Sequence, residues 1–304
     1  MVITGIGLLL PGAASFSELR SAMEDGKRLT GTVETPELHG IKGLGFTNSL
    51  TKKALFAMYQ AMEDSGISDS ENTGVFLGSA FGSLKTMADF ERMIAEDRRR
   101  SAMPMDFMNT VMNAAAGQLA IFGGLSGMNM TLSSGSRSAY DAMEYASDML
   151  AAGRINAAIA GGIEEMHELY EAFIRKNGAV PSDGVCLFVT ERREDAIRRG
   201  AHIYAEVLSM AAEYMPDGAD TSAVRERAVR EAGIDLDRID LEVTNTGGNA
   251  ARILKMKDIT DEIYSASFAA AAAAAIAAGK NGDIAMVTSV GFDGFAGCAV
   301  IKIY

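Results

Sequence analysis

The residues best suited to take part in a reaction lie in a Ser- and Gly-rich segment, residues 131–142 (TLSSGSRSAYDA). An apolar run ends at Ser133 and a helical pattern begins near Ser138, so we expect Ser136 in a tight turn between a strand and a helix. The positive end of a helix dipole favours a nucleophile at such a turn. The G-x-S-x-G pattern of serine nucleophiles is incomplete, because Ser134 and Ser138 replace its glycines. From these residues alone, a turn whose hydroxyl groups cap the helix is the plainer interpretation.

Sites for cofactors and metals lack their usual residues. The opening segment has Gly5 and Gly7, but Leu10 replaces the third glycine of a dinucleotide-binding loop, and no G-x-x-x-x-G-K-[ST] loop for phosphate occurs. The three histidines are scattered along the chain without the spacing of metal ligands. We therefore expect neither a cofactor nor a metal.

Cysteine usage and the terminal sequence indicate the compartment. Cys186 and Cys298 each lie in an apolar run, which predicts buried thiols in a reducing environment. The first residues (MVITGIGLLLPG) lack the basic region of a signal peptide. The longest apolar stretch, residues 268–278, is too short to span a bilayer. These features predict a cytoplasmic protein without a membrane-spanning segment.

The chain is acidic, with 28 basic and 40 acidic residues and a formal charge of −12. Such a charge repels nucleic acid backbones and anionic membrane surfaces, so we expect neither as a partner. The one basic cluster, residues 98–100 (RRR), is more simply a solvated helix end. A length of 304 residues with 48% apolar content allows a large core and about two domain-sized units.

Short β-rich runs alternate with longer helical patterns, which is typical of α/β folds. We predict strands at residues 2–6, 74–77, 128–133, 157–160, 186–190, 201–212, 241–244, 283–289 and 297–303. We predict helices at residues 15–25, 51–65, 85–98, 107–121, 138–152, 191–199, 223–232 and 268–278. No low-complexity linker separates the two halves of the chain, so they should share one continuous core.

Five segments occur in the order that one known family shows. They are residues 2–12 (VITGIGLLLPG), 74–82 (GVFLGSAFG), 113–127 (NAAAGQLAIFGGLSG), 157–164 (AAIAGGIE) and 184–207 (GVCLFVTERREDAIRRGAHIYAEV). Through them the chain resembles the β-ketoacyl-acyl-carrier-protein synthases, the condensing enzymes of fatty acid and polyketide synthesis. The resemblance implies an α/β thiolase-like fold, a five-layered α-β-α-β-α sandwich built from two similar halves. We place these halves at residues 1–165 and 166–304.

The positions at which the family holds its catalytic residues differ in this chain. Ser136 stands at the position of the catalytic cysteine, and Thr246 (in VTNTGG) stands at that of the first catalytic histidine. In the segment EIYSASFAAAAA, Ser267 replaces the second histidine and Glu262 replaces the family's lysine. The loop GFDGFAG resembles the family's G-F-G-G-x-N loop, with Asp293 as a departure.

These replacements remove the groups that the family's reaction uses. Condensation needs a thiolate to accept the acyl chain and two imidazoles to promote decarboxylation of the malonyl group. A helix N-terminus can activate a thiol, but it cannot make an alcohol comparably reactive without a base. Glu262 also inverts the charge where an anionic malonyl group would bind. The resemblance therefore implies a vestigial site at Ser136, Thr246, Ser267 and Glu262, with no catalytic residue.

The favoured hypothesis is a non-catalytic subunit similar to the chain-length factors of type II polyketide, aryl-polyene or fatty-acid-like synthesis. The resemblance implies a heterodimer with an active ketosynthase, joined edge to edge near residues 128–133, in which both subunits bound an acyl tunnel. The residues that we expect at the tunnel and interface are Met105, Phe107, Met108, Met112 and Met130. Ordinary core packing is the alternative role for these residues.

An acyl carrier protein is a further expected partner. Carrier proteins are strongly acidic, as this chain is, so we expect the carrier to dock through the ketosynthase, with residues 98–100 as the one local exception. Two other hypotheses stay open. One is a Ser136-dependent acyltransferase or decarboxylase, and the other is a homodimeric pseudo-enzyme that binds an acyl chain or a carrier protein.

Overall fold

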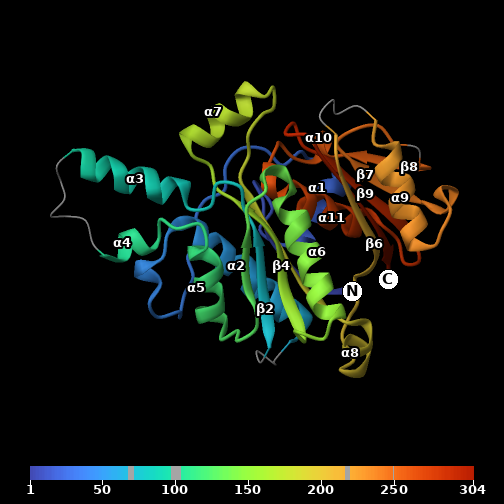
Figure 1. Ribbon diagram of the computed structural model, residues 1–304, viewed down its shortest axis with the longest axis horizontal. Coiled ribbons are helices and arrows are strands. Elements are labelled where there is room, and N and C mark those ends of the chain that lie inside the picture. The colour runs from blue at the N-terminus through green and yellow to red at the C-terminus, as the bar shows by residue number, and fades with distance from the viewer. Residues whose placement is uncertain (68–71, 97–103, 216–219, 249) are drawn as a thin grey trace.

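The computed structural model describes residues 1–67, 72–96, 104–215, 220–248 and 250–304, except for the side chain of Met105 (Figure 1). The basic residues 98–100 therefore lie outside the described part of the chain. Within that part, the strands form one sheet in the order β3-β2-β4-β5-β1-β6-β10-β9-β7-β8.

The sheet consists of two groups of five strands. The first group contains β1 (Val2–Leu9), β2 (Thr73–Gly78), β3 (Asn129–Leu132), β4 (Ala157–Glu164) and β5 (Gly184–Glu191). The second group contains β6 (Ala205–Tyr214), β7 (Leu241–Thr244), β8 (Arg252–Lys255), β9 (Ile284–Val290) and β10 (Phe295–Ile303). In the described residues, the strands of the two groups pair with each other only through two residue pairs between β1 and β6. This narrow connection lets the two parts of the sheet form separate layers.

Helices cover both faces of each group of strands, and further helices lie in the connecting segments. The helices of the described residues are α1 (Phe16–Glu24), α2 (Ser49–Ser65), α3 (Leu84–Ala95), α4 (Pro104–Met108), α5 (Ala114–Gly123), α6 (Ser138–Ala151), α7 (Glu168–Lys176), α8 (Arg193–Arg198), α9 (Ser222–Ala232), α10 (Met256–Ile259) and α11 (Ser267–Ala278). Short 3-10 turns include η1 (Leu44–Phe46), η3 (Gly135–Arg137) and η5 (Tyr264–Ala266).

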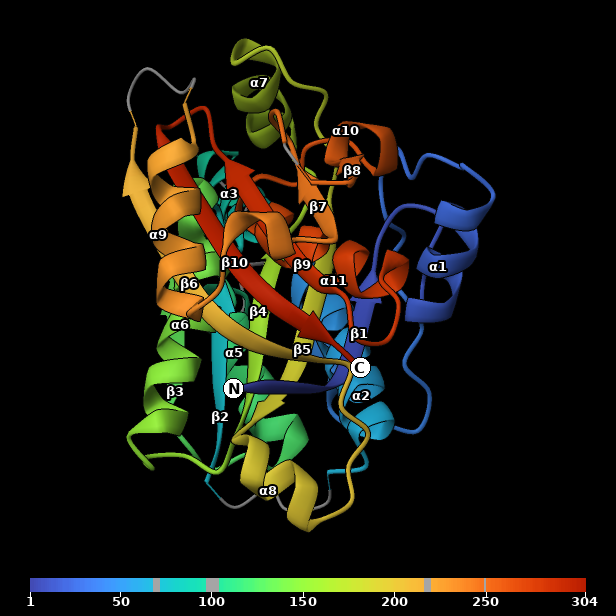
Figure 2. The same ribbon diagram turned by 90° about the vertical axis from the view of Figure 1, so that its right-hand side faces the viewer.

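The helices and strands stack in five layers (Figures 1 and 2). Helices α2 and α5 pack on the outer face of the first group, and α9 packs on the outer face of the second. Helices α6 and α11 lie between the two groups and contact strands of both halves as well as each other. The predicted α-β-α-β-α sandwich is therefore confirmed.

Small residues allow the layers to approach closely. In α11 every residue from Ala269 to Ala275 is buried, because only methyl groups fit between the two sheets. In β1 a Cβ atom added at Gly7 would lie 1.8 Å from the carbonyl oxygen of Ala57 in α2. The central layer thus depends on alanine and glycine at these contacts.

The prediction of one continuous helix at residues 107–121 is wrong. The structure ends α4 at Met108 and begins α5 at Ala114. Between them, the Asn109 side chain donates a hydrogen bond of 2.6 Å to the carbonyl oxygen of Phe46, and the Asn48 amide donates to the carbonyl oxygen of Asn109. These tertiary hydrogen bonds hold the chain in a bend, which helical periodicity alone does not reveal.

Three of the helices and strands were not predicted, namely α7, α10 and β8. We expected no helix at α7, which His167 caps by accepting a 3.3 Å hydrogen bond from the backbone nitrogen of Leu169. The short strand β8 was also missed. The division of the chain at residue 165 stays a prediction, although β5, which follows it, pairs with β1 and β4 of the first group.

Candidate functional site

Ser136 lies in the expected turn between a strand and a helix. The turn η3 connects β3 to α6, and Ser136 at its centre is only 4% exposed. The Ser138 side chain donates a hydrogen bond of 2.7 Å to the carbonyl oxygen of Gly135, which closes the turn. Gly135 has a φ angle of +66°, a conformation that glycine adopts without strain. Local hydroxyl groups and one glycine therefore hold Ser136 at the start of α6.

The partner of Ser136 is a carboxylate. The Ser136 hydroxyl donates a hydrogen bond of 2.5 Å to Oδ1 of Asp293, and the Ser136 backbone nitrogen donates one of 2.9 Å to Oδ2. The Tyr264 hydroxyl donates a further 2.9 Å hydrogen bond to Oδ2. No histidine is among the hydrogen-bond partners of Ser136 in the described residues.

This cluster of Ser136, Tyr264 and Asp293 holds the serine proton but does not remove it. A carboxylate is a weak base toward an alcohol, so it orients the hydroxyl without producing a useful amount of alkoxide. Burial and the nearby charge of Asp293 raise the pKa of Tyr264, which keeps the phenol protonated as a donor. The cluster is therefore a stable set of hydrogen bonds rather than an activated nucleophile.

The cluster is tightly enclosed. A Cβ atom added at Gly291 would lie 1.9 Å from Oγ of Ser136. The Tyr264 ring stacks on Phe292 with centroids 5.0 Å apart, and Phe173 packs edge-on against both rings. From the sequence we noted Asp293 only as a departure from the family loop, and we missed Tyr264. Its φ angle of +52° is unusual for a residue with a side chain, and no sequence pattern predicts it.

Glu262 and Ser267 are close together, as the segment containing them suggests. The Ser267 hydroxyl donates a 2.7 Å hydrogen bond to Oε1 of Glu262, and the backbone nitrogen of Tyr264 donates one of 2.8 Å to the same oxygen. Burial raises the pKa of Glu262, and the charge of Asp293 contributes in the same direction. Tyr264 thus connects this pair to the Ser136 cluster.

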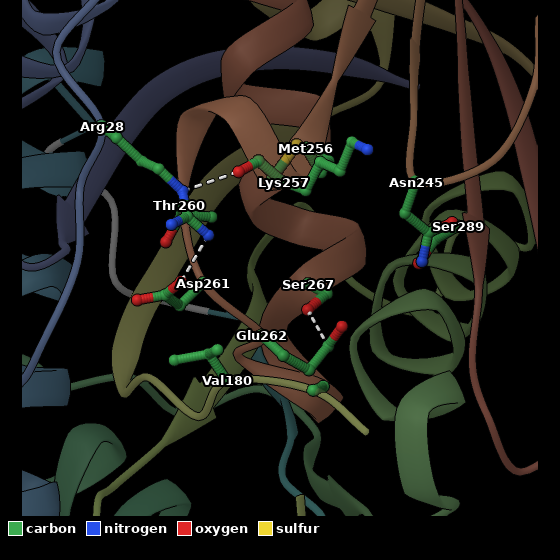
Figure 3. A pocket seen from close by; sticks show the side chains of 11 residues that line it. Arg28, Val180, Asn245, Met256, Lys257, Thr260, Asp261, Glu262, Ser267 and Ser289 are labelled. Carbon is green, nitrogen blue, oxygen red and sulfur yellow. Dashed lines mark hydrogen bonds and ion pairs between the residues drawn. The ribbon is translucent and has the colours of Figure 1, made fainter. Parts of the chain in front are cut away.

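Thr246, the fourth residue of the vestigial set, does not contact the other three. Its hydroxyl lies 3.0 Å from that of Thr244, at the end of β7. The neighbouring Asn245 lines a cavity of about 250 Å³ together with Glu262 and Ser267 (Figure 3). The structure therefore gathers three of the four positions around Tyr264 and places Thr246 on the adjoining loop.

A buried carboxyl group lies behind this site. Glu164, at the end of β4, accepts hydrogen bonds from the backbone nitrogens of Ala80 (3.0 Å) and Phe81 (3.3 Å) and from the Ser265 hydroxyl. Burial raises the pKa of Glu164 to about 7. The residue ties the loop after β2 to η5, and so helps to position Tyr264.

Strand β3, near which we expected the interface, is an edge of the sheet. Phe107 and Met108 lie in α4, and Met112 lies just before α5, the helix that contacts β3. Phe107 is 60% exposed, and Met108 and Met112 are also exposed. Ordinary core packing is therefore not the role of these three residues. Met130 packs partly buried against the central core, and the side chain of Met105 lies outside the described part of the chain.

Further exposed apolar side chains surround this edge. Ile121 on α5 is 74% exposed, and Met128 and Tyr145 are exposed as well. We call Phe107, Met108, Met112, Ile121, Met128 and Tyr145 the β3-edge surface. Exposed apolar side chains gathered in one region are a common mark of a protein interface.

No helix among the described residues is long and apolar enough to cross a membrane. No group of three or more His, Cys, Asp or Glu side chains in the same part of the chain is arranged to hold a metal ion. Cys186 and Cys298 are buried free thiols, as predicted.

Comparison with solved structures identifies the fold. A structure described as "The ishigamide ketosynthase/chain length factor" matches with a TM-score of 0.83 and 25% identity, over 99% of each chain. The protein thus has the fold of the thiolase-type ketosynthases. Residues 43–200, just over half of the chain, match the family model "Beta-ketoacyl synthase, N-terminal domain". The chain therefore belongs to the β-ketoacyl synthase family.

Curated relatives agree with this assignment. The 3-oxoacyl-[acyl-carrier-protein] synthase 2 of Vibrio cholerae is 27% identical, in an alignment that covers 85% of this chain and 76% of the relative. A putative polyketide beta-ketoacyl synthase 1 of Streptomyces virginiae is 25% identical and covers 79% of this chain and 71% of its own length. The chain is thus similar to synthases of both fatty acid and polyketide systems.

Proposed function

We propose that the protein is a non-catalytic subunit of the chain-length-factor type, which pairs with an active ketosynthase and shapes its acyl tunnel. The observation that carries this proposal is the hydrogen bond from the Ser136 hydroxyl to Asp293. A hydroxyl bonded to a carboxylate lies where a condensing enzyme needs a thiolate that can be acylated. The name of the ishigamide ketosynthase/chain length factor supports the same type of assembly.

The replaced residues argue against independent condensation. Decarboxylation of a malonyl group develops negative charge, which donors or cations must stabilise. Here Glu262 and Asp293 bring carboxyl groups into that region, and Ser267 offers a hydroxyl already bonded to Glu262. The local charge therefore opposes the step that the family's lysine and histidines support.

The β3-edge surface supports pairing with a second subunit. Strand β3 is an unpaired edge of the sheet, and an exposed edge is a template for pairing with another chain. Phe107, Met108 and Met112 are exposed apolar side chains, and the two methionines are flexible enough to adapt to the end of a tunnel. We propose the same role for Met105 and Met130.

The carrier protein is proposed to dock on the ketosynthase partner. The charge of −12 on this chain opposes the approach of an acidic carrier. A solved complex described as a type II polyketide synthase acyl-carrier protein with its ketosynthase shares the fold, with a TM-score of 0.82. Type II polyketide, aryl-polyene and fatty-acid-like synthesis are the proposed settings, and the cytoplasm is the proposed compartment.

Co-expression with an active ketosynthase tests the proposal. We expect a one-to-one complex that condenses acyl and malonyl groups supplied on a carrier, while this chain alone does neither. Mass spectrometry should find the acyl group on the partner's cysteine and none on Ser136. An acyl ester on Ser136 would instead support the acyltransferase or decarboxylase hypothesis. A stable homodimer that ignores the ketosynthase would support the binding pseudo-enzyme.

A further inference from the structure

The charge beside the open edge at β3 comes from a single helix. Strands β2 and β3 and helix α5 contain no charged residue, whereas α6, which contacts both strands, contains Asp141, Glu144 and Asp148. Residues three, four and seven positions apart lie on one face of a helix, so these acids share a face with the exposed Tyr145. Since Tyr145 belongs to the β3-edge surface, this face of α6 is the acidic part of that surface.

One cation accompanies the three acids, and its position is fixed from within the subunit. The Arg137 guanidinium donates to Asp141, and its Nη2 atom lies 3.5 Å from Oε2 of Glu144. Cζ of the same arginine lies 5.5 Å from the ring centroid of Tyr140 and 5.6 Å from that of Phe295. Arg137 therefore balances part of the charge of α6, and the acids remain in excess on the exposed face.

The excess charge is tolerable only while water reaches it. Burial raises the pKa of Glu144, and the negative charges of Asp141 and Asp148 contribute in the same direction. Asp148 is exposed, so solvent and salt screen its charge in the isolated chain. Covering this face with a second negative surface would remove that screening and leave like charges facing one another out of water.

Pairing of two copies at β3 would create that unfavourable contact. Antiparallel pairing of two edge strands about a two-fold axis keeps the same face of the sheet on the same side in both copies. Because α6 packs beside β3, the axis would bring α6 of one copy next to α6 of the other. Like charges set against each other at an interface suppress the wrong partner, and opposite charges favour the right one. The acidic face thus opposes a homodimer and suits a basic partner.

We propose that the acidic face of α6 selects a partner subunit whose facing helix carries Lys or Arg side chains, and that it prevents this chain from pairing with itself. The inference deepens the proposed function and rests on it, because it takes β3 as the edge at which the ketosynthase pairs. It adds the chemistry of the partner's contact surface. The ketosynthase that fits this chain is basic where α6 is acidic.

Charge reversal on α6 tests the inference with two copies of this chain and no ketosynthase. The variant Glu144→Lys with Asp148→Lys is a basic copy whose α6 is complementary to that of the unmodified chain. Analytical ultracentrifugation, with one copy fluorescently labelled, should find a one-to-one mixed dimer at least about tenfold tighter than either homodimer. Absence of the mixed dimer, or an unmodified homodimer of equal affinity, would overturn the inference.

Neutral variants and a control on another helix separate this effect from misfolding and from net charge. Glu144→Gln with Asp148→Asn keeps an acceptor for the Tyr140 hydroxyl, which lies 3.1 Å from Oε1 of Glu144. It should self-associate at least about tenfold more tightly than the unmodified chain and bind an active ketosynthase at least about tenfold more weakly. The control is Glu226→Lys with Glu231→Lys on α9, outside the second group of strands, which changes the net charge as much as the basic copy does. It should form no mixed dimer with the unmodified chain, and an equally tight mixed dimer would contradict a role specific to α6.

The inference and the proposed function can fail separately. A mixed dimer of the unmodified and basic copies, together with no binding of an active ketosynthase, would support selection by charge at α6 and contradict the proposed function. Binding of a ketosynthase with an affinity that the neutral variants leave unchanged would support the proposed function and overturn the inference.

Discussion

The two edges of the sheet differ sharply, although both are short strands paired in parallel to their neighbours. At one end, β3 (NMTL) carries no charged residue and is surrounded by the β3-edge surface. At the other end, β8 (RILK) begins with Arg252, which is paired with Asp283, and ends with Lys255. Charged side chains protect edge strands from pairing with other chains. Of these two edge strands, β8 carries protective charges and β3 does not, which agrees with the proposed pairing at β3.

The two groups of strands also differ in the buried charges beside them. Next to the first group, Lys53 lies between two carboxylates, with Nζ 2.7 Å from Asp183 and 3.4 Å from Glu165. Next to the second group, Arg225 forms a buried ion pair with Glu242 at 2.7 Å. Removing a cation that serves two buried acids leaves more uncompensated charge than removing one that serves a single acid.

The largest expected effect is at the open edge. Replacing Ile121 and Met128 together by Glu would place two carboxylates in the proposed interface, where desolvation is costly. We expect the complex with the ketosynthase to weaken at least about a thousandfold, measured by surface-based binding kinetics.

The matched control is Ile253→Glu, because Ile253 lies in β8 and is also exposed, at 39%. It should leave the affinity for the ketosynthase unchanged. If the β8 variant disrupts the complex and the β3-edge variant does not, the assignment of the partner edge is wrong.

A smaller effect is expected for the buried charges. Lys53→Met leaves Asp183 and Glu165 buried without their cation, so the free energy of unfolding should fall by about 3 to 5 kcal/mol. Arg225→Met removes the cation beside one carboxylate, Glu242, and should cost less. Urea unfolding of both variants measures the difference, and equal losses would remove this contrast between the two groups of strands.

The pH dependence of stability should report on Glu164. Its native pKa of about 7 lies above the ordinary value of 4.5, so the folded state binds this proton more tightly than the unfolded state. This contribution is complete below the unfolded pKa and is lost as the pH rises through about 7. Glu164→Gln should remove about 2 to 3 kcal/mol of the fall in unfolding free energy between about pH 5 and pH 8. Parallel curves for the two proteins would show that Glu164 does not titrate in this range.

The smallest effect is expected at Ser136. Ser136→Ala removes one hydrogen bond to Asp293, and it should lower the free energy of unfolding by about 1 kcal/mol. Condensation by the complex should stay within about twofold, since the proposal gives Ser136 no chemical step. A loss of condensing activity beyond about tenfold would indicate that Ser136 is a catalytic residue.

Local patterns predicted much of the fold and little of the site. The Ala-rich run gave α11, and the pattern before and after Ser133 gave the turn that holds Ser136. By contrast, Ser136 and Asp293 are 157 positions apart in the chain, and only the packed structure brings them together. The bend at Asn109 and the backbone conformation of Tyr264 likewise depend on tertiary contacts.

The carboxylate of Asp293 also bears on any thiol placed at position 136. A cysteine introduced there would place its sulfur beside a negative charge, which disfavours ionisation of the thiol. Ser136→Cys alone is therefore expected to give a poorly reactive thiol, and replacing Asp293 by a neutral residue as well should make that thiol easier to ionise.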